Sequence, residues 1–394
     1  MKYMVLIIDG AAGLPIPARG GRTCLELAKT PHLDKLAAEG FGGLVRTVPP
    51  GMEPSSACAC MSVLGYDPTV YYKGRASIEA RSLGIDIGAG EVVFRCNLVT
   101  VLEGKMEDYS AGHITTAAAG ELIKALNEKL GSDEVEFFPG VSYRHILKLK
   151  GRAETLQATC TPPHDIPGKP VKEYLPQGAG SDFLINLMAR SESVFKDHPV
   201  NIARKKRGQL PATGIWLFWG SGQLPAMPTF KKAYGLSAAM TSGVDLLRGL
   251  AKMANMDILD IRGVTDDSDN DNAAQVNGAL ETLKKHDLVV VHIEAPDEAG
   301  HSGSVAEKIK AIEKIDNEVI SRLRQYNGDL RVLVMPDHPT PVTVRTHTPD
   351  PVPFLIWGKG VKANGMKRFT EAEAKKTSVF IGEGYKIMGK LVGK

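Results

Sequence analysis

The chain has 394 residues, of which 43% are apolar, so it is long enough for two domains or for one large domain with an insertion. Its 48 basic and 45 acidic residues leave a net charge of +3, which gives no electrostatic reason to expect nucleic acid or a membrane as partner. The sequence contains no long apolar run, no signal peptide pattern, and five cysteines without regular spacing. We therefore expect a cytoplasmic protein with reduced thiols.

The first predicted element is a buried strand over residues 4–8, which Asp9 follows directly. Five consecutive apolar residues are typical of a central parallel strand that is covered on both faces. An acid at the carboxyl end of such a strand lies where open α/β sheets bind ligands, although Asp is also a good helix cap. A helix over residues 30–40 and a strand over 44–48 then predict a β-α-β start.

A Pro/Gly-rich loop next brings Ser55 and Ser56 to the start of a helix that ends near Gly65. A hydroxyl at a helix N-terminus is a candidate nucleophile, because the free N–H groups and the dipole there stabilise an alkoxide or a phosphate. The alternative is that the serine only caps the helix, which is the commoner role. Cys58 and Cys60 are expected to pack in the hydrophobic core rather than to act as thiolate ligands.

The pattern changes at about residue 91, where strands over 94–101, 135–140 and 142–151 and a helix over 115–130 predict a small α+β layer. We expect an inserted cap domain at 91–175 and a core domain at 1–90 and 176–394. The insert carries polar side chains that suit an anionic ligand, although a single arginine on a strand is often a solvated edge charge. These candidates are Arg95, Asn97, His113, Arg144, His164 and Asp165.

After the insert, a helix over 184–195, a strand over 214–220, a buried helix over 234–256 and a strand over 256–261 predict a return to α/β alternation. The acidic loop 266–272 resembles a calcium loop. However, Asp271 stands where that loop requires glycine, and Asn277 stands where it requires glutamate. We therefore expect a solvated or substrate-facing loop.

The last third places acids and histidines beyond two more buried strands and in one loop. Asp297 and His301 are four residues apart, which puts both on one face of a helical turn, as a metal pair requires. Buried carboxylates that meet at one sheet edge repel one another unless a cation joins them, so two divalent metals are expected. The candidate ligands are Asp9, Asp297, His301, Asp337, His338 and His347. Such a ligand set suits manganese, zinc, cobalt or iron better than calcium, and coordination would lower the pKa of Ser56.

Several motifs together resemble the archaeal-type, cofactor-independent phosphoglycerate mutases, including their bacterial branch, within the alkaline phosphatase superfamily. They are MVLIIDG, MSVLGYDP, YYKGR, FRCN, SAGHITT, EAPDEAGH, PDHPTP and THTPDPVPFLI, and they span essentially the whole chain. The resemblance implies an α/β fold with an alkaline-phosphatase-like parallel sheet sandwiched by helices and an inserted smaller α+β cap. It also implies that Ser56 carries the phosphoryl group as phosphoserine. One metal would be held by Asp9, Ser56, Asp337 and His338, and the other by Asp297, His301 and His347.

The implied activity is interconversion of 2- and 3-phosphoglycerate in glycolysis and gluconeogenesis, without 2,3-bisphosphoglycerate. Manganese is the expected metal, with zinc, cobalt or magnesium as alternatives, and the partner is a small phosphorylated metabolite. The chain departs from the family pattern around the serine. Ser56 lies between Ser55 and Ala57, where family members have Gly and Asp, and Cys60 stands where family members have Asn or His. Three alternatives to the mutase activity remain. The first is a homoserine-kinase-like phosphotransferase, although the sequence contains no P-loop. The others are a metal-dependent phosphomonoesterase or sulfatase-like hydrolase, and a non-catalytic metal-binding relic. The sequence does not indicate an oligomeric state.

Overall fold

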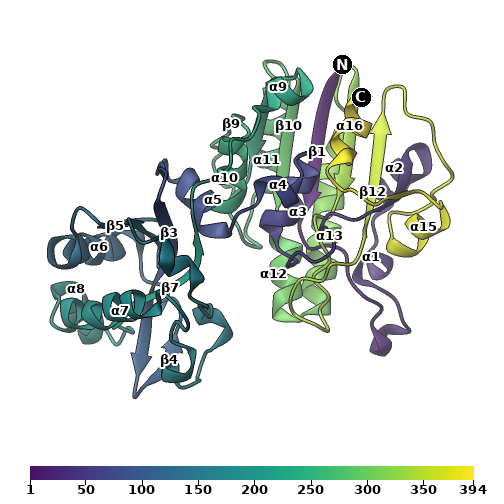
Figure 1. The fold of residues 1–394 in the computed structure, drawn as a ribbon. Coiled ribbons are helices and arrows are strands. Elements are labelled where there is room, and N and C mark those ends of the chain that lie inside the picture. Colours follow the sequence, from purple (N-terminus) through teal and green to yellow (C-terminus); the bar gives the residue numbers. More distant parts are fainter. The chain divides into compact units, whose positions relative to one another are not determined.

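The computed structural model describes residues 1–394, which form two compact units (Figure 1). The core unit comprises Met1–Tyr72 and Ala226–Lys394, and the inserted unit is the continuous segment Lys73–Pro225. These boundaries correct the predicted insert of 91–175, which was too short at both ends. Residues 73–90 and 176–225 belong to the inserted unit because a helix and a strand within them pack on its central strand.

The core unit is built on an eight-stranded sheet whose order is β13-β2-β12-β11-β1-β10-β8-β9. These strands are β1 (Lys2–Ile8), β2 (Phe41–Val45), β8 (Ala238–Thr241), β9 (Asp257–Ile258), β10 (Leu288–Ile293), β11 (Leu330–Met335), β12 (Val352–Gly358) and β13 (Phe380–Ile381). The central strand β1 pairs in parallel with β10 on one side and with β11 on the other. Residues 4–8 are buried, as the apolar run predicted, because helices cover both faces of the sheet.

One strand departs from the predicted parallel sheet, since β12 runs antiparallel to both β11 and β2. The segment between β11 and β12, residues 336–351, contains no crossover helix. A strand parallel to the one before it must begin at the same edge of the sheet, so the chain has to cross back, whereas an antiparallel strand begins at the edge where the previous strand ends. The chain therefore stays at the carboxyl edge of the sheet after β11, which keeps His338 and His347 at that edge.

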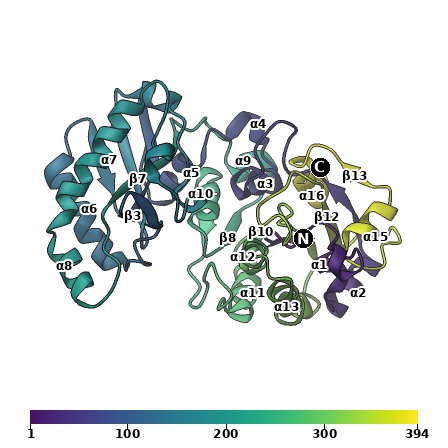
Figure 2. The ribbon, with the colours of Figure 1, turned by 90° about the horizontal axis from the view of Figure 1, so that it is seen from below.

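Helices form a layer on each face of this sheet (Figure 2). One layer contains α3, α10 and α16, which pack on one another and on β8 and β11, and the other contains α2, α11 and α13, joined by a π-helical turn over Asp316–Ile320. The helices of the core unit are α1 (Cys24–Leu27), α2 (Pro31–Glu39), α3 (Ser56–Val63), α4 (Pro68–Tyr71), α9 (Phe230–Tyr234), α10 (Asp245–Met253), α11 (Asn272–Thr282), α12 (Ala295–Ser302), α13 (Val305–Ile315), α14 (Ser321–Leu323), α15 (Glu371–Lys376) and α16 (Lys386–Val392).

The predicted buried helix over 234–256 is wrong in its first half. Its first half contains the strand β8, which pairs in parallel with β10, and only α10 is helical within the second half. A short buried segment such as Ala238–Thr241 fits a strand as well as a helix, so periodicity did not separate the two. The break between them falls at Gly243, where any side chain would collide with the backbone of Thr265.

The inserted unit contains a five-stranded antiparallel sheet around the long strand β3. Helices α6 and α7 cover one face, and α5 covers the other. The elements are α5 (Arg75–Ser82), β3 (Glu91–Leu102), β4 (Lys105–Asp108), α6 (Thr116–Leu130), β5 (Val135–Phe138), β6 (Arg144–Lys150), α7 (Ser181–Lys196), α8 (Pro199–Lys206) and β7 (Gly214–Ser221). The predicted α+β character is confirmed, but the apolar strand β7, which was assigned to the core domain, pairs with β3. In neither unit does a helix have the length and apolar composition needed to cross a membrane.

Candidate metal centre and serine

An acidic residue follows each of the neighbouring strands β11, β1 and β10. Asp9 directly follows β1, Asp337 lies two residues beyond β11, and Asp297 lies in α12 after β10. Because the three strands are parallel, these carboxylates meet at one edge of the sheet, as the sequence predicted. All three side chains are buried, so their charges are poorly solvated.

His338 lies between two of these acids and the candidate nucleophile. Its Nε2 atom is 3.1 Å from Asp337 Oδ2, 3.8 Å from Asp9 Oδ1 and 3.1 Å from Ser56 Oγ. Asp9 Oδ1 is buried and has no hydrogen-bond partner. An acceptor atom that is buried without a donor is strongly destabilising unless a cation or a water molecule meets it. These four side chains are the ones predicted for one metal.

The residues predicted for the other metal form an adjoining group around Asp297. His301 Nε2 is 3.1 Å from Asp297 Oδ2, His347 Nε2 is 3.6 Å from Asp297 Oδ1, and the two Nε2 atoms are 3.0 Å apart. The rings of His338 and His347 lie 3.9 Å apart between their centroids, so the two groups share a border. By distance alone, His338 also belongs with Asp297 and His347.

The two serines at the start of α3 are placed differently. The side chain of Ser55 accepts a hydrogen bond from the Cys58 N–H and caps the helix, whereas Ser56 is the first helical residue and its hydroxyl faces His338. The cap and nucleophile interpretations therefore apply to different residues. The cysteines also differ, because Cys58 packs in a small apolar cluster while Cys60 Sγ donates to Asp337 Oδ2 at 3.4 Å. Burial and the nearby Asp337 carboxylate hold the pKa of Cys60 well above its ordinary value, which keeps it a thiol.

The electrostatics of the cluster fit a bound divalent cation. Burial, together with Asp337 and Asp297, raises the pKa of Asp9 well above its ordinary value. Burial also lowers the pKa of His338 to about 4, so this imidazole is neutral at pH 7. Neutral imidazole and several carboxylates are the ligands that manganese, zinc and cobalt prefer, and such a cation would stabilise the ionised form of Asp9.

Three further residues of the cluster were not predicted from the sequence. His292 Nε2 lies 2.6 Å from Asp9 Oδ2 and 3.4 Å from a Glu294 oxygen. The Thr340 hydroxyl donates to Asp297 Oδ1 and lies 3.3 Å from His338 Nδ1. A histidine inside the apolar run LVVVHI was the available signal for His292, since buried polar side chains need a partner.

In the inserted unit, Arg95 is buried and engaged in an ion pair. Its Nη1 donates to both carboxylate oxygens of Glu79 at 2.7 and 2.6 Å, and Arg75 Nε donates to the same group at 2.7 Å. Arg95 Nε is buried without a hydrogen-bond partner, which leaves one donor of this guanidinium unused. Arg95 and Arg75 also lie 5.9 and 4.5 Å from the ring of Trp219.

Asn97 and Arg144 face each other across β3 and β6. Asn97 donates to the Tyr109 carbonyl at 3.4 Å, and its own Oδ1 is buried without a partner. The Arg144 guanidinium lies 5.4 Å from the ring of Tyr143, which in turn lies 5.8 Å from the ring of Tyr109. These two predicted residues are therefore gathered around a pair of tyrosines.

The other predicted residues of the insert lie around the same aromatic side chains. The His113 ring is 6.3 Å from Tyr143, and the His164 ring is 6.2 Å from Tyr109. Asp165 lies at the exposed side of this group, with its side chain 60% exposed and 3.9 Å from His164. The Trp219 ring beside Arg95 lies 5.5 Å from the His164 ring. The inserted unit thus brings together five of the six predicted substrate residues, four through ring contacts and Asn97 through the Tyr109 carbonyl, with Asp165 at the edge.

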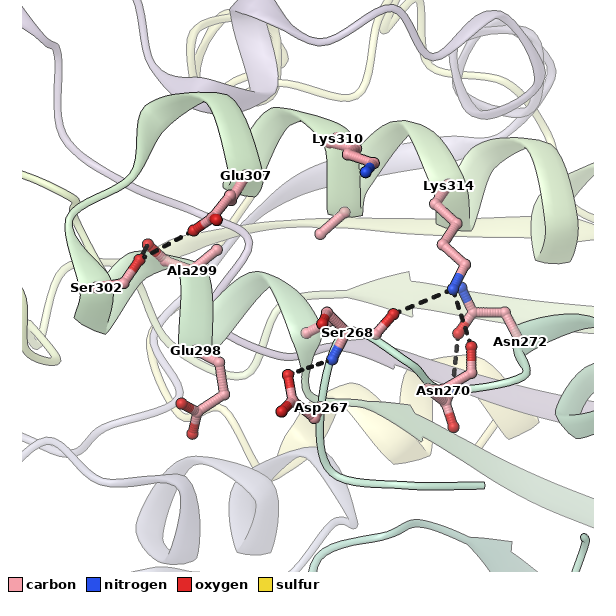
Figure 3. A pocket seen from close by; sticks show the side chains of 12 residues that line it. Asp267, Ser268, Asn270, Asn272, Glu298, Ala299, Ser302, Glu307, Lys310 and Lys314 are labelled. Carbon is pink, nitrogen blue, oxygen red and sulfur yellow. Dashed lines mark hydrogen bonds between the residues drawn. The ribbon is translucent and has the colours of Figure 1, made fainter. Parts of the chain in front are cut away.

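A separate pocket of about 630 Å³ lies between α12, α13 and the acidic loop 266–272 (Figure 3). Lys314 Nζ closes one end by donating to the carbonyls of Ser268 and Asn270 at 3.2 and 3.0 Å. Glu298 lines the pocket, whereas the predicted site residues on the same helix, Asp297 and His301, do not. The loop predicted to be solvated or substrate-facing thus lines a pocket that is distinct from the acid and histidine cluster.

The fold and the cluster define the class of protein. A helix-covered α/β sheet with buried acids and imidazoles beside a serine at its carboxyl edge offers the ligands and the hydroxyl that a metal-assisted phosphoryl-transfer enzyme uses. A family model for 2,3-bisphosphoglycerate-independent phosphoglycerate mutase matches residues 37–201.

Curated relatives with that name match over the whole chain. The chain is 46% identical to the Methanothrix thermoacetophila protein over 100% of both chains, and 44% identical to the Methanosarcina barkeri protein over 100% of this chain and 99% of that one. The solved cofactor-independent phosphoglycerate mutase of Thermoplasma acidophilum is 27% identical, with a TM-score of 0.65 over 100% and 99% of the two chains. A Pyrococcus horikoshii structure, also 27% identical, has a TM-score of 0.82 over 100% and 97%. The chain belongs to the 2,3-bisphosphoglycerate-independent phosphoglycerate mutases.

Proposed function

We propose that this chain interconverts 2- and 3-phosphoglycerate by transferring the phosphoryl group to Ser56 and back to the other hydroxyl of the glycerate. The observation that carries this proposal is the position of Ser56 Oγ, 3.1 Å from His338 Nε2 at the border of the acid and histidine cluster. Ser55 takes the capping role at the same helix end, so the Ser56 hydroxyl is left for chemistry. Full-length relatives named as mutases support the choice of substrate.

We assign one divalent metal to Asp9, Ser56, Asp337 and His338, and a second to Asp297, His301 and His347. Manganese is the proposed metal. The metals would supply Lewis acid stabilisation for the attacking and leaving oxygens and a lowered pKa for the serine hydroxyl. The buried, unpartnered Asp9 Oδ1 and the neutral imidazole of His338 support this assignment.

The chain's own groups then have distinct tasks. Ser56, as the first residue of α3, lies beside the free backbone N–H groups of a helix start, which favour the negative charge of a bound phosphoryl group. The Thr340 hydroxyl holds Asp297 on one side and contacts the His338 ring on the other, so it fixes two of the assigned ligands at once. Such preorganisation lowers the cost of reaching the transition state.

A mutase must also retain glycerate while the phosphoryl group is on the serine, which a phosphatase need not do. We assign that retention to the inserted unit as a cap that binds the glycerate carboxylate and hydroxyls. The supporting groups are the unused donor of Arg95, the partly buried guanidinium of Arg144, the His113 and His164 rings beside the tyrosines, Asn97 bonded to the Tyr109 carbonyl, and Asp165 beside His164. Arginine forks match carboxylate geometry, which favours Arg95 and Arg144 as the main contacts.

The test is to supply metal-stripped protein with manganese and 3-phosphoglycerate, and to follow 2-phosphoglycerate and free phosphate together. We expect isomerisation without added 2,3-bisphosphoglycerate and with little free phosphate. Ser56→Ala is expected to lose activity by about a thousandfold or more, because it removes the nucleophile.

Ser55→Ala is the matched control for this experiment. It removes the cap that bonds to the Cys58 N–H and should cost about 1 kcal/mol of stability while isomerisation persists. Phosphate release that exceeds isomerisation would instead indicate a phosphomonoesterase. Phosphoryl transfer to another acceptor, such as homoserine, would indicate a different phosphotransferase on the same serine.

A further inference from the structure

His292 is a buried polar side chain of the cluster to which the assigned ligand set gives no role. It is the fifth residue of the six-residue strand β10, opposite Ile7 of β1 in the parallel register, and its side chain has no solvent exposure. Its Nε2 atom lies 2.6 Å from Asp9 Oδ2 and 3.4 Å from the nearest Glu294 oxygen. The shorter distance shows that the hydrogen bond of this nitrogen goes to Asp9.

The direction of that bond follows from the chemistry of the pair. A carboxylate that holds a metal is ionised and only accepts hydrogen bonds, so with a metal on Asp9 the Nε2 atom would carry the proton and donate to Asp9 Oδ2. The other oxygen, Asp9 Oδ1, is buried and receives no hydrogen bond. His292 therefore occupies one oxygen of the carboxylate and leaves the second available.

The imidazole is itself held in place from its other edge. Its Nδ1 lies 3.0 Å from Ser242 Oγ, and that hydroxyl accepts a hydrogen bond from the Val244 N–H at 3.0 Å. Gln275 Nε2 donates to the His292 carbonyl at 2.9 Å, which fixes the backbone of the same residue. All of these groups belong to the core unit, and the chain of contacts runs from the turn after β8, through β10, to the end of β1.

We propose that His292 is a positioning residue that turns the Asp9 carboxylate so that Oδ1 alone is presented to a metal. This inference rests on the ligand role assigned to Asp9 above. A carboxylate that is free to rotate must be ordered when the metal binds, whereas a hydrogen-bonded one is already oriented. Without a donor, Asp9 Oδ2 would also be buried and unsatisfied.

The experiment measures manganese affinity of metal-stripped protein by the electron paramagnetic resonance signal of free Mn²⁺. His292→Leu removes the donor, and we expect affinity to fall by about 10- to 100-fold, as for other residues that orient metal ligands. His292→Gln keeps an N–H close to the position of Nε2, so it should bind manganese within about threefold of the native chain. The visible absorption of bound Co²⁺ should change in His292→Leu and be kept in His292→Gln.

His286 provides the matched control, because it forms the same kind of pair with an exposed aspartate outside the cluster. His286 Nε2 lies 2.8 Å from Asp257 Oδ2, just before β10 begins. His286→Leu should therefore leave manganese affinity unchanged. If His292→Leu does not fold, Ser242→Ala replaces it, since the imidazole then loses its anchor and affinity should fall by a smaller factor.

Asp9→Asn separates this inference from the ligand assignment on which it rests. If Asp9→Asn weakens manganese binding but His292→Leu does not, His292 has no positioning role and the ligand assignment stands. Equal losses in His292→Gln and His292→Leu would also overturn the inference, because the donor would then not be the cause. Native affinity in Asp9→Asn would overturn the assignment of Asp9 itself.

Discussion

Single side chains of the cluster must change charge when a metal binds, and His301 is the clearest example. Burial disfavours its cationic form, but the hydrogen bond to Asp297 and its negative charge, together with the Arg345 carbonyl and the Glu298 charge, outweigh burial and raise the pKa of His301 to about 9 in the metal-free protein. A histidine ligand binds a metal through a neutral imidazole nitrogen. Metal binding at neutral pH therefore displaces a proton from His301.

The raised pKa of His301 predicts how metal-free stability depends on pH. The folded state holds this proton more tightly than the unfolded state, so the contribution is complete below pH 6.5 and is lost as the pH rises through about 9. We expect the melting temperature in EDTA to fall over that range in the native chain, and less in His301→Gln. Circular dichroism melts at pH 6.5 and pH 9 measure the difference. Equal slopes in the two proteins would contradict the prediction.

The ion pair of Arg95 and Glu79 gives a second prediction for single residues. Both side chains are about nine-tenths buried, so Arg95→Leu leaves the Glu79 carboxylate partly uncompensated and should cost about 3 kcal/mol. If Arg95 also contacts substrate, this variant raises KM for 3-phosphoglycerate. Glu79→Gln is the control, since it breaks the same ion pair but keeps the guanidinium. Equal increases in KM would show that Arg95 acts through the fold and not through substrate contact.

At the scale of elements, apolar runs predicted where the chain forms buried strands but not which sheet each strand joins. The run in β7 resembles those of β1 and β10, and only its pairing with β3 places it in the inserted unit. The prediction for the stretch containing β8 and α10 was wrong for a similar reason, because a four-residue segment such as Ala238–Thr241 fits a strand or a helix. Pairing partners are non-local, so one sequence read in short windows does not contain them.

The candidate site was easier to predict, because its position follows from a general rule of parallel sheets. Asp9, Asp297 and Asp337 follow apolar strands, and parallel strands bring their carboxyl ends to one edge. The contacts that orient them were not predictable in this way. The pairing of His292 with Asp9 and the division of roles between Ser55 and Ser56 depend on strand register and backbone direction.

At the scale of the whole molecule, the two units are built from the chain in different ways. The inserted unit is one continuous segment with its own hydrophobic core. The core unit joins both ends of the chain, and its cluster draws on residues from Asp9 to His347. The cluster therefore exists only when the distant segments of the core unit have folded together, whereas the inserted unit contains none of the assigned metal ligands.

This arrangement predicts how metal acts on unfolding. A cation that binds the native core unit but not its unfolded chain stabilises that unit by about 2.7 kcal/mol at one hundred times its dissociation constant. For a unit of this size, that energy corresponds to a rise of about 5–10 °C in melting temperature. We expect calorimetry of the metal-stripped protein to resolve two transitions, of which manganese raises only the one that belongs to the core unit. Asp297→Asn should reduce the shift, because it alters a carboxylate of one assigned metal that contacts both His301 and His347, while the ligands of the other metal stay in place. A single transition that manganese moves as a whole would instead show that the inserted unit unfolds together with the metal centre.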